Sequence, residues 1–431
     1  MNLEDQGPGS RGQGPEVRSQ GPGARSQVTD KDFSGPRPPA PGPLRILMLA
    51  PTPYFADRGC HVRIFEEARA LTDKGHQVRI VTYHLGRDMP PVPVERIISI
   101  PWYRKLEAGP SWHKPYLDML LLIKGLKVAK RFSPHIIHAH LHEGALIGGA
   151  LARLLKLPLL FDYQGSLSGE SLDHGFFSSG SWLHRLFRKA ESAINSMADM
   201  IITSSTSAAE ELAQDWGVHP EKISPLPDGV DMISFRHRSR KEARKRLGIS
   251  DGIPLFVYLG LLNSYQGIDL LLEAVKMLVA RGRAFHIAIM GFPEAAYRQK
   301  AGQMNISEFV TFTGRVSYSD APLLLSAGDI AISPKLSDTE ANGKLLNYMA
   351  CALPVIAFDN RVNREILGEE GIYAENGSVD SLVNWMNAAL NDLDTMKKTG
   401  ERLHERALHL HSWESRVNQL DSFYRKLLKL A

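Results

Sequence analysis

The sequence predicts an α/β protein with two doubly wound, Rossmann-like domains of parallel sheet. Short apolar runs alternate with helical patterns along most of the chain, which is the punctuation of βαβ units. The central runs are continuously apolar, as parallel strands covered on both faces are. With 431 residues, the chain is too long for one ordinary core, so about two domains are expected.

The first series of elements starts at residue 44. It opens with the strand LRILMLA, the helix RIFEEARALTDKG and the strand QVRIVTY. Further strands are expected before residue 228, with helices between most of them: ERIISI (95–100), HIIHAH (135–140), PLLFDY (158–163), DMIITSS (199–205) and KISPLP (222–227). This series predicts an N-terminal domain over residues 44–235.

The second series follows the basic segment FRHRSRKEARKRLG, which we interpret as a linker and the exposed face of a helix. Its predicted strands are PLFVYLG, FHIAIMG, FVTFTG, DIAISP, PVIAFD and GIYAE. They predict a C-terminal domain over residues 236–412. The closing segment, residues 413–431, has the pattern of an amphipathic helix.

Residues 1–43 predict a Gly/Pro-rich, disordered tail, because their repeated QGPG and RSQ units supply no apolar core. The chain contains no apolar run of about 18 residues, so no membrane span is expected. The two cysteines match no metal or redox spacing, which favours a reducing, cytoplasmic compartment. The net charge of +4 does not call for a nucleic-acid partner.

Ligands of doubly wound sheets bind beyond the carboxyl ends of the strands, so the residues after each strand are the functional candidates. In SPKLSDTEANGKLLNYMACALPVIAFD (333–359), Lys335 and Lys344 flank a polar loop and a helix start. The first N–H groups of a helix lack helical partners and attract anions. An anion is therefore expected near residues 341–344, and solvated loop lysines are the alternative interpretation.

On the first domain, the loop Asp57-Arg58-Gly59-Cys60 follows the first strand. Gly59 permits close backbone approach and Arg58 suits an acceptor anion, although Gly59 is equally well interpreted as a plain turn residue. After PLLFDY, Gln164 and its neighbours suit a polyhydroxylated acceptor, and Glu170 would assist deprotonation of the attacking hydroxyl. The alternative for Glu170 is a solvated side chain.

The stretch HAHLHEG allows a rival interpretation, because the alternating His138, His140 and His142 could bind zinc from one strand face. A metal hydrolase would also need a carboxylate ligand and a base. The strand is expected to end near His140, after which His142 turns away with the loop. We therefore expect no metal, and a buried, hydrogen-bonded histidine is the ordinary interpretation of His140.

Taken together, the motifs resemble glycosyltransferase family 4, the group-1 glycosyltransferases with a GT-B fold. The resemblance spans roughly residues 44–428 and is carried by the order and spacing of its motifs. These are RILMLAP, KGHQVRIVT, PHIIHAH and PLPDGVD in the first half, and YLGLLNSYQGIDLLLEA, IMGFP, VTFTGRV, GDIAISP and YMACALPVIAFDN in the second. It implies a C-terminal helix that crosses back to the first domain.

The resemblance also implies a function. A retaining, metal-independent hexosyltransferase would move a sugar from a nucleotide-sugar co-substrate to a hydroxyl acceptor, either a saccharide or a lipid-linked glycan, without a further cofactor. The donor-binding candidates, from the resemblance and from the loop positions above, are Gly260, Gln266, Gly291, Phe292, Arg315, Lys335, Thr339, Ala341, Asn342, Gly343, Lys344 and Asn347. The acceptor-binding candidates are Arg58, Gly59 and Gln164, and the catalytic candidates are His140, Glu170 and Glu340.

The chain departs from the family pattern at several charged positions. Leu261 and Gln266 stand where many members carry Arg and Lys, Thr339 and Asn347 stand where they carry glutamates, and Gln164 stands where they carry His. Loss of two charge-assisted hydrogen bonds would lower affinity for a diphosphate roughly a hundredfold to ten-thousandfold. Either Lys335 and Lys344 replace the missing cations, or the chain is a catalytically silent GT-B binding module or subunit.

One segment suggests a further partner. WYRKLEAGPSWHKPYLDMLLLIKGLKVAKRF (102–132) combines aromatic and basic residues with an apolar stripe, a composition that suits anionic lipid. Peripheral contact with the inner membrane face is thus one interpretation, and an ordinary core-facing helix is the other.

Overall fold

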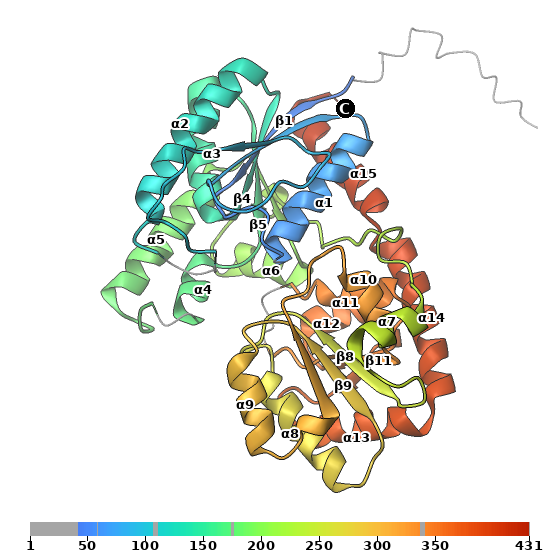
Figure 1. Ribbon diagram of the computed structural model, residues 1–431. Coiled ribbons are helices and arrows are strands. Elements are labelled where there is room, and N and C mark those ends of the chain that lie inside the picture. Colours follow the sequence, from blue (N-terminus) through green and yellow to red (C-terminus); the bar gives the residue numbers. More distant parts are fainter. Residues whose placement is uncertain (1–41, 58, 107–110, 174–175, 337–340, 431) are drawn as a thin grey trace, which may run out of the picture. The chain divides into compact units, whose positions relative to one another are not determined.

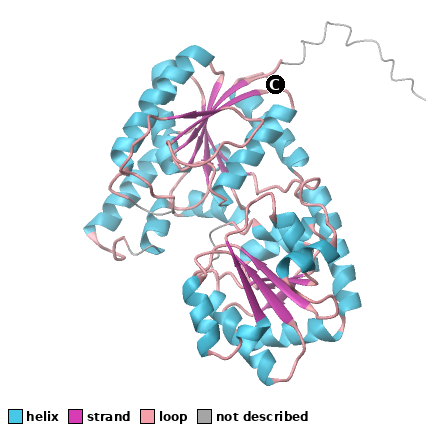
Figure 2. Cartoon of the chain, viewed as in Figure 1, coloured by secondary structure: helices cyan, strands magenta, loops and turns pink. Residues whose placement is uncertain are grey.

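The computed structural model describes residues 42–57, 59–106, 111–173, 176–336 and 341–430. The predicted tail, residues 1–43, lies outside the described residues except for its last two. Helices and strands alternate along the described chain, and the strands gather into two sheets (Figures 1 and 2). We call the part of the chain around the first sheet the N-lobe and the part around the second the C-lobe.

The N-lobe sheet has the strand order β3-β2-β1-β4-β5-β6-β7, with neighbouring strands paired in parallel. The order reverses direction between β1 and β4, as in a doubly wound sheet. The strands are β1 (Arg45–Ala50), β2 (Gln77–Thr82), β3 (Val94–Arg96), β4 (Ile136–His140), β5 (Leu159–Tyr163), β6 (Met200–Thr203) and β7 (Ile223–Pro225).

Helices cover both faces of this sheet. They are α1 (Gly59–Asp73), α2 (Lys114–Phe132), α3 (Leu141–Leu155), α4 (Leu167–Asp173), α5 (Trp182–Met197), α6 (Thr206–Gln214) and the short η1 (Pro220–Lys222). Strand β1 shows why both faces must be covered. Leu47 and Leu49 enter the core under α2 and α3, while Ile46 and Met48 enter the core under α1, because successive side chains point to opposite faces.

The C-lobe repeats the scheme with the strand order β10-β9-β8-β11-β12-β13. Its strands are β8 (Leu255–Leu259), β9 (His286–Met290), β10 (Val310–Gly314), β11 (Ile330–Ser333), β12 (Val355–Phe358) and β13 (Ile372–Ala374). Its helices are α7 (Arg240–Leu247), α8 (Ile268–Ala280), α9 (Ala295–Gln303), η2 (Ser307–Phe309), α10 (Ala321–Leu325), α11 (Lys344–Ala350), α12 (Arg361–Leu367), η3 (Gly368–Glu370), α13 (Val379–Asn391) and α14 (Leu393–Leu410). The predicted fold class is confirmed.

The last helix, α15 (Trp413–Leu427), packs on the N-lobe. It contacts α1, and Val417, Leu420 and Tyr424 join the core beneath that helix. The chain crosses back to the N-lobe beside Val230, where it first leaves that lobe. There the Val230 N–H donates to the His411 carbonyl (2.8 Å), and the Trp413 N–H donates to the Val230 carbonyl (3.3 Å). The predicted crossing helix is thus present, whereas the exact domain bounds stay predictions.

Two local predictions were wrong. The predicted strand 95–100 is only the three-residue β3, because its partner β2 ends at Thr82 and offers no further backbone groups to pair with. The residues HEG, expected as a loop, form the first turn of α3, which starts at Leu141 directly after β4.

Candidate functional site

Two glycines hold the exits of β8 and β9 together in the C-lobe. The Gly260 N–H donates to the Met290 carbonyl (3.0 Å), and a Cβ on Gly291 would overlap the Gly260 carbonyl oxygen. Gly260 also has a φ of +148°, which side-chain-bearing residues rarely adopt. Both predicted donor residues therefore have a structural reason to be glycine.

Lys344, the first residue of α11, reaches back to the β8 exit. Its ammonium donates to the Gln266 amide oxygen and to the Tyr258 hydroxyl (3.2 Å), and it lies 4.6 Å from the centre of the Tyr258 ring. Lys344 is half-buried. The structure thus brings together Lys344 and Gln266, two predicted donor residues separated by 78 positions.

Lys335 has a different environment. Its side chain is only 2% exposed, and its ammonium donates to the Ala341 carbonyl (2.9 Å), so a solvated loop lysine is the wrong interpretation for this residue. This contact joins residues on either side of the segment 337–340. That segment lies outside the described residues, and the predicted Thr339 and Glu340 belong to it. At the start of α11, the Leu345 and Leu346 N–H groups already donate to the carbonyls of Asn342 and Gly343. An anion contact of the N–H groups at residues 341–344 stays a prediction.

Asn342 connects three elements at the same edge. Its buried amide donates to the Ser333 hydroxyl (3.0 Å) and to the Asn363 amide oxygen (2.7 Å). Asn347 lies one turn into α11 and is half-buried. The observed contacts of Asn342 are structural, and a role of either residue toward the donor stays a prediction.

Phe292 and Arg315 follow β9 and β10 and stack on each other. The guanidinium carbon of Arg315 lies 3.8 Å from the centre of the Phe292 ring. A flat, partly exposed platform of this kind suits a planar ligand. The structure therefore brings together two of the predicted donor-binding side chains.

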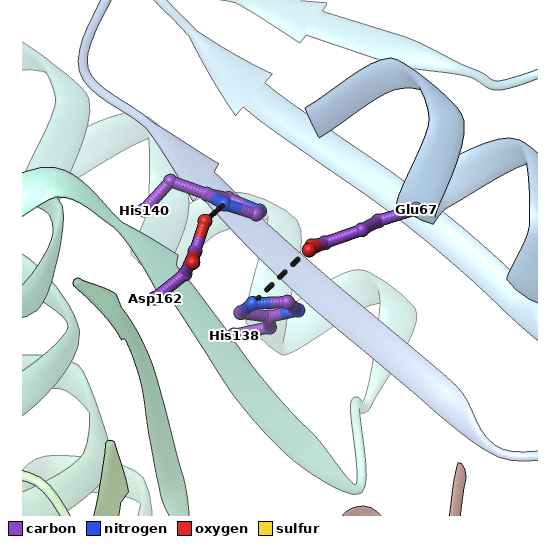
Figure 3. A group of neighbouring side chains, drawn as sticks. All are labelled: Glu67, His138, His140 and Asp162. Carbon is purple, nitrogen blue, oxygen red and sulfur yellow. Dashed lines mark hydrogen bonds and ion pairs between the residues drawn. The ribbon is translucent and has the colours of Figure 1, made fainter. Parts of the chain in front are cut away.

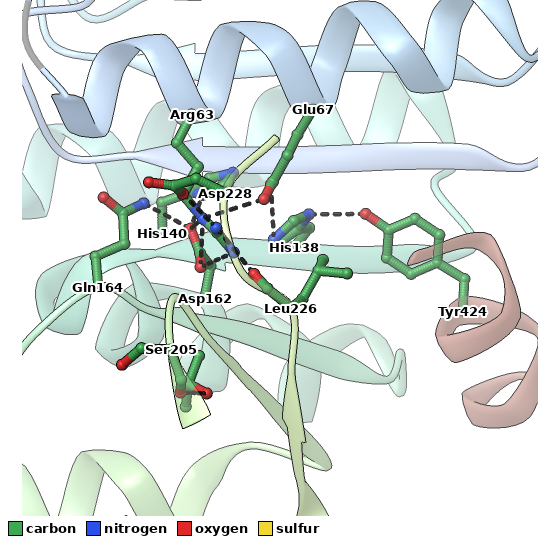
Figure 4. Close-up of polar contacts among 11 residues, drawn as sticks. Arg63, Glu67, His138, His140, Asp162, Gln164, Ser205, Leu226, Asp228 and Tyr424 are labelled. Carbon is green, nitrogen blue, oxygen red and sulfur yellow. Dashed lines mark hydrogen bonds and ion pairs between the residues drawn. The ribbon is translucent and has the colours of Figure 1, made fainter. Parts of the chain in front are cut away.

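In the N-lobe, Arg63 on α1 organises a buried cluster of polar side chains (Figure 4). Its guanidinium contacts Asp162 through two nitrogens (2.9 and 3.0 Å), Asp228 (2.6 Å) and Glu67 (3.2 Å). It also donates to the Leu226 carbonyl (3.0 Å). Buried charge of this kind persists only where partners compensate it, so Arg63 fixes the carboxylates at the exits of β5 and β7.

His138 and His140 project from β4 into the same cluster (Figure 3). The His140 Nδ1–H donates to Asp162 (2.9 Å), His138 Nδ1 is bonded to the Tyr424 hydroxyl on α15 (2.7 Å), and both rings are fully buried. His142 turns away as predicted and pairs with Glu191 (3.4 Å). A catalytic role for His140 stays a prediction, since the side chain has no exposed surface here.

Burial sets the protonation of this cluster. It lowers the pKa of His138 well below its ordinary value, so the imidazole is neutral. It raises the pKa of Glu67 well above the ordinary value despite the Arg63 charge. Burial alone would also raise the pKa of Asp162, but the charge of Arg63 and the hydrogen bond from His140 hold it below its usual range.

The predicted acceptor residues have mixed outcomes. Gln164 donates to Asp162 (2.5 Å) and so joins the Arg63 cluster. Gly59 is the exposed first residue of α1, and a Cβ there would meet nothing within 4 Å, so no steric need for glycine is present. Arg58 and the side chain of Glu170 lie outside the described residues.

A small cavity of about 10 Å³ is lined by residues from both lobes. Asp228 and Ser205 come from the N-lobe exits, Ala341 and Glu365 from the C-lobe, and His411 from the return of the chain. The Asp228 carboxylate lies 3.3 Å from where a Gly343 Cβ would stand. The Arg63 cluster and the start of α11 are therefore neighbours.

The sequence interpretation missed Arg63, Asp162 and Asp228. Asp162 and Asp228 follow the rule for the carboxyl ends of strands, because they lie in PLLFDY and PLPDGVD, and that signal could have identified them. Arg63 gave no such signal, because an arginine in the first turns of an amphipathic helix is usually exposed.

Comparison with known proteins agrees with the fold and its motifs. A glycosyl transferase 4-like domain matches residues 58–229, and a glycosyl transferases group 1 domain matches residues 253–392. Sulfoquinovosyl transferase SQD2 of Arabidopsis thaliana is 24% identical over 398 residues, covering 88% of this chain and 72% of its own length. D-inositol 3-phosphate glycosyltransferase of Geodermatophilus obscurus is 24% identical over 388 residues, covering 85% of this chain and 84% of its own.

Solved structures share the architecture. Sucrose-phosphate synthase from Thermosynechococcus elongatus superposes with a TM-score of 0.75 at 19% identity, over 90% of this chain and all of its own. Anabaena Alr3699/HepE in complex with UDP-glucose gives 0.72 at 17% identity, over 89% of this chain and all of its own. These likenesses show the GT-B fold, and the two domain matches together span more than two thirds of the sequence. The chain belongs to the group 1 glycosyltransferases.

Proposed function

We propose that this glycosyltransferase is catalytically active and retaining, and that it moves a hexose-type sugar from a nucleotide-sugar donor on the C-lobe to a hydroxyl acceptor on the N-lobe. The acceptor would be a saccharide or a lipid-linked glycan. Transfer would need neither a metal ion nor a further cofactor. The solved Anabaena structures hold UDP and UDP-glucose, so UDP is the first nucleotide to test.

The position of the Lys344 ammonium carries this proposal. Gln266 stands where many family members carry a lysine, and the Lys344 ammonium donates to its amide oxygen from α11. Lys344 on α11 would thus supply, beside Gln266, the positive charge that is missing from the loop after β8. A diphosphate at the β8 exit would exchange the neutral Gln266 partner of Lys344 for an anion.

The chemistry follows from charge development. When the bond from the sugar to the leaving phosphate breaks, negative charge grows on the diphosphate. The Lys344 ammonium, positioned over the Tyr258 ring, would stabilise that charge more than it stabilises the intact donor. Lys335, by donating to the Ala341 carbonyl, would hold the loop that leads to Gly343 beside the donor. The Phe292–Arg315 stack would receive the nucleotide base.

The proposed acceptor site on the N-lobe is supported by fewer observed contacts than the donor site. Gln164, Gly59 and Arg58 would line the acceptor, and Glu170, Glu340 and His140 stay the candidates for catalytic groups. Gln164 is the best supported of the six, because its hydrogen bond to Asp162 orients the amide at the β5 exit.

The test is calorimetric binding of UDP to the wild type and to Lys344→Ala. Loss of one charge-assisted hydrogen bond predicts a weakening of roughly tenfold to a hundredfold, with partial rescue in Lys344→Arg. Lys300→Ala is the matched control, because Lys300 pairs with Asp269 on the C-lobe surface and should leave binding unchanged. Equal affinity in wild type and Lys344→Ala would remove the proposed phosphate site.

Turnover separates an enzyme from a silent module. Donor hydrolysis, measured across a panel of nucleotide sugars, is expected for at least one donor and should fall in Lys344→Ala. A chain that binds nucleoside diphosphates but hydrolyses and transfers no donor would be a binding module.

We also propose that the N-lobe contacts anionic membrane where a lipid-linked acceptor would be presented. Trp102 and Trp112 are 74% and 82% exposed, and Met119 and Ile123 on α2 are exposed as well. Among the described helices, none is long and apolar enough to cross a bilayer. In a co-sedimentation experiment, the wild type should pellet with phosphatidylglycerol vesicles, and the double variant Trp102→Ala/Trp112→Ala should stay in the supernatant. Neither protein should pellet with neutral phosphatidylcholine vesicles.

A further inference from the structure

The Arg63 cluster contains three buried groups with polar atoms that have no hydrogen-bond partner in the described part of the chain. Glu67 on α1 and His138 and His140 on β4 are each 0% exposed, and Figure 3 shows their side chains converging. Both Glu67 oxygens and the Nε2 atoms of both histidines have no hydrogen-bond partner among the described residues. Such atoms are costly to bury, so something must satisfy them.

The opposite nitrogen of each ring is already fixed. His140 Nδ1–H donates to the Asp162 carboxylate (2.9 Å), which leaves its Nε2 as a bare lone pair. His138 Nδ1 is bonded to the Tyr424 hydroxyl (2.7 Å). A carboxylate or hydroxyl behind an imidazole is the support that metal-ligating histidines usually have.

We propose that Glu67, His138 Nε2 and His140 Nε2 bind a divalent transition-metal ion, with zinc as the best fit. Two imidazoles and one carboxylate form a recurrent zinc ligand set. One donor atom from each of Glu67, His138, His140 and Asp162 lies within 4.8 Å of the other three. Ligands of tetrahedral zinc are about 3.4 Å apart at its usual bond lengths, so the side chains close in by about 1 Å when the ion binds.

Arg63 lies beside this site and its charge must be counted. Its Nε is 3.2 Å from Glu67 Oε1, while Glu67 Oε2 faces His138 Nε2 at 3.7 Å. The guanidinium contacts three carboxylates, those of Glu67, Asp162 and Asp228. Metal ligation requires an ionised Glu67 carboxylate and bare imidazole nitrogens, and in that state the three carboxylates and Arg63 together carry a net charge of two minus. A dication balances that charge in a place from which water is excluded.

The site is structural, because none of its ligands is exposed. It would join α1 to β4 and, through Tyr424, hold α15 on the N-lobe. It is independent of the proposed transfer reaction. It also competes with one prediction, because a ligating His140 has no lone pair left for an acceptor.

The test is metal analysis of the full chain, expressed with zinc and purified without a polyhistidine tag. About one zinc per chain is expected in the wild type, and less than a tenth of that in Glu67→Gln and in His138→Gln. His142→Gln is the matched control, because His142 is also buried but pairs with Glu191 outside the cluster. It should keep its zinc.

A second measurement serves if a ligand variant fails to fold. The metal-stripped wild type and Tyr424→Phe are titrated with Zn²⁺ against a chromophoric chelator, and Co²⁺ is added to detect tetrahedral absorption bands. Loss of the hydroxyl behind His138 should weaken zinc about 10- to 100-fold. The proposal is overturned if the wild type neither carries nor binds zinc or cobalt, or if the ligand variants bind as tightly as the wild type.

Discussion

Asp162 shows how one residue sets the chemistry of its surroundings. It is fully buried at the end of β5 and accepts hydrogen bonds from Arg63, His140 and Gln164. The side chain therefore compensates part of the Arg63 charge and orients the His140 ring and the Gln164 amide. A buried carboxylate is stabilised by its hydrogen-bond donors, and the donors in turn need it as their acceptor.

Asp162→Asn should consequently be costly. The exchange removes one of the three carboxylates that contact Arg63 inside the N-lobe, and breaking a buried ion pair from one side costs about 3–5 kcal/mol. Urea unfolding should show this loss in Asp162→Asn and less than about 0.5 kcal/mol in Asp251→Asn, an exposed control. A loss below 1 kcal/mol in Asp162→Asn would mean that Arg63 does not need this partner.

Asp118 on α2 gives a prediction of pH dependence. Burial raises its pKa to about 7, although the Tyr83 hydroxyl donates to it. The folded value lies above the unfolded value of about 4, so the stabilising contribution is complete below pH 4 and is lost as the pH rises through 7. A rise of this size corresponds to at most about 4 kcal/mol.

The matching experiment compares unfolding free energies of wild type and Asp118→Asn between pH 5 and pH 8. The wild type should lose stability relative to the variant as the pH rises, because only the wild type must ionise a buried carboxyl. Parallel curves over that range would show that Asp118 titrates below pH 5 in the folded chain.

At the scale of elements, the exits of β8 and β9 depend on the touching pair Gly260 and Gly291. In Gly291→Ala the new Cβ would overlap the Gly260 carbonyl, so the two loops must separate. We expect a loss of about 2–4 kcal/mol and, if the donor binds there, at least tenfold weaker binding of UDP. Gly252→Ala is the control, because a Cβ at that position meets nothing within 4 Å. Wild-type affinity in Gly291→Ala would place the nucleotide elsewhere.

Elements with a strong local signal could be predicted from the sequence. Buried parallel strands such as β1 and β4 are continuous apolar runs, so β4 was located to within one residue. The end of β3 could not be predicted, because it depends on where β2 stops. The Tyr424–His138 contact joins residues 286 positions apart, and no local pattern encodes it. The same holds for Lys344 and Gln266, whose meeting requires the whole C-lobe sheet.

At the scale of the whole molecule, contacts from three parts of the chain connect the lobes. The Val230 and Trp413 backbones pair where the chain crosses between lobes. Glu365 on α12 accepts hydrogen bonds from the Thr206 N–H and hydroxyl (both 3.0 Å) at the start of α6. Tyr318 supplies the third connection from the loop after β10. These contacts predict that the lobes unfold as one cooperative unit.

Tyr318 is the contact whose loss should break that cooperativity. Its ring packs against Phe55 and Phe65 of the N-lobe, its N–H donates to Asp57 (2.9 Å), and its hydroxyl donates to Glu66 (2.9 Å). Tyr318→Ala removes the ring and the hydroxyl at a cost of about 3–5 kcal/mol, and most of that loss falls on the connection between lobes. Scanning calorimetry should then resolve two transitions in place of one. Tyr318→Phe keeps the ring and should retain a single, slightly lower transition, whereas a single transition in both variants would assign the coupling to the chain crossings and α15.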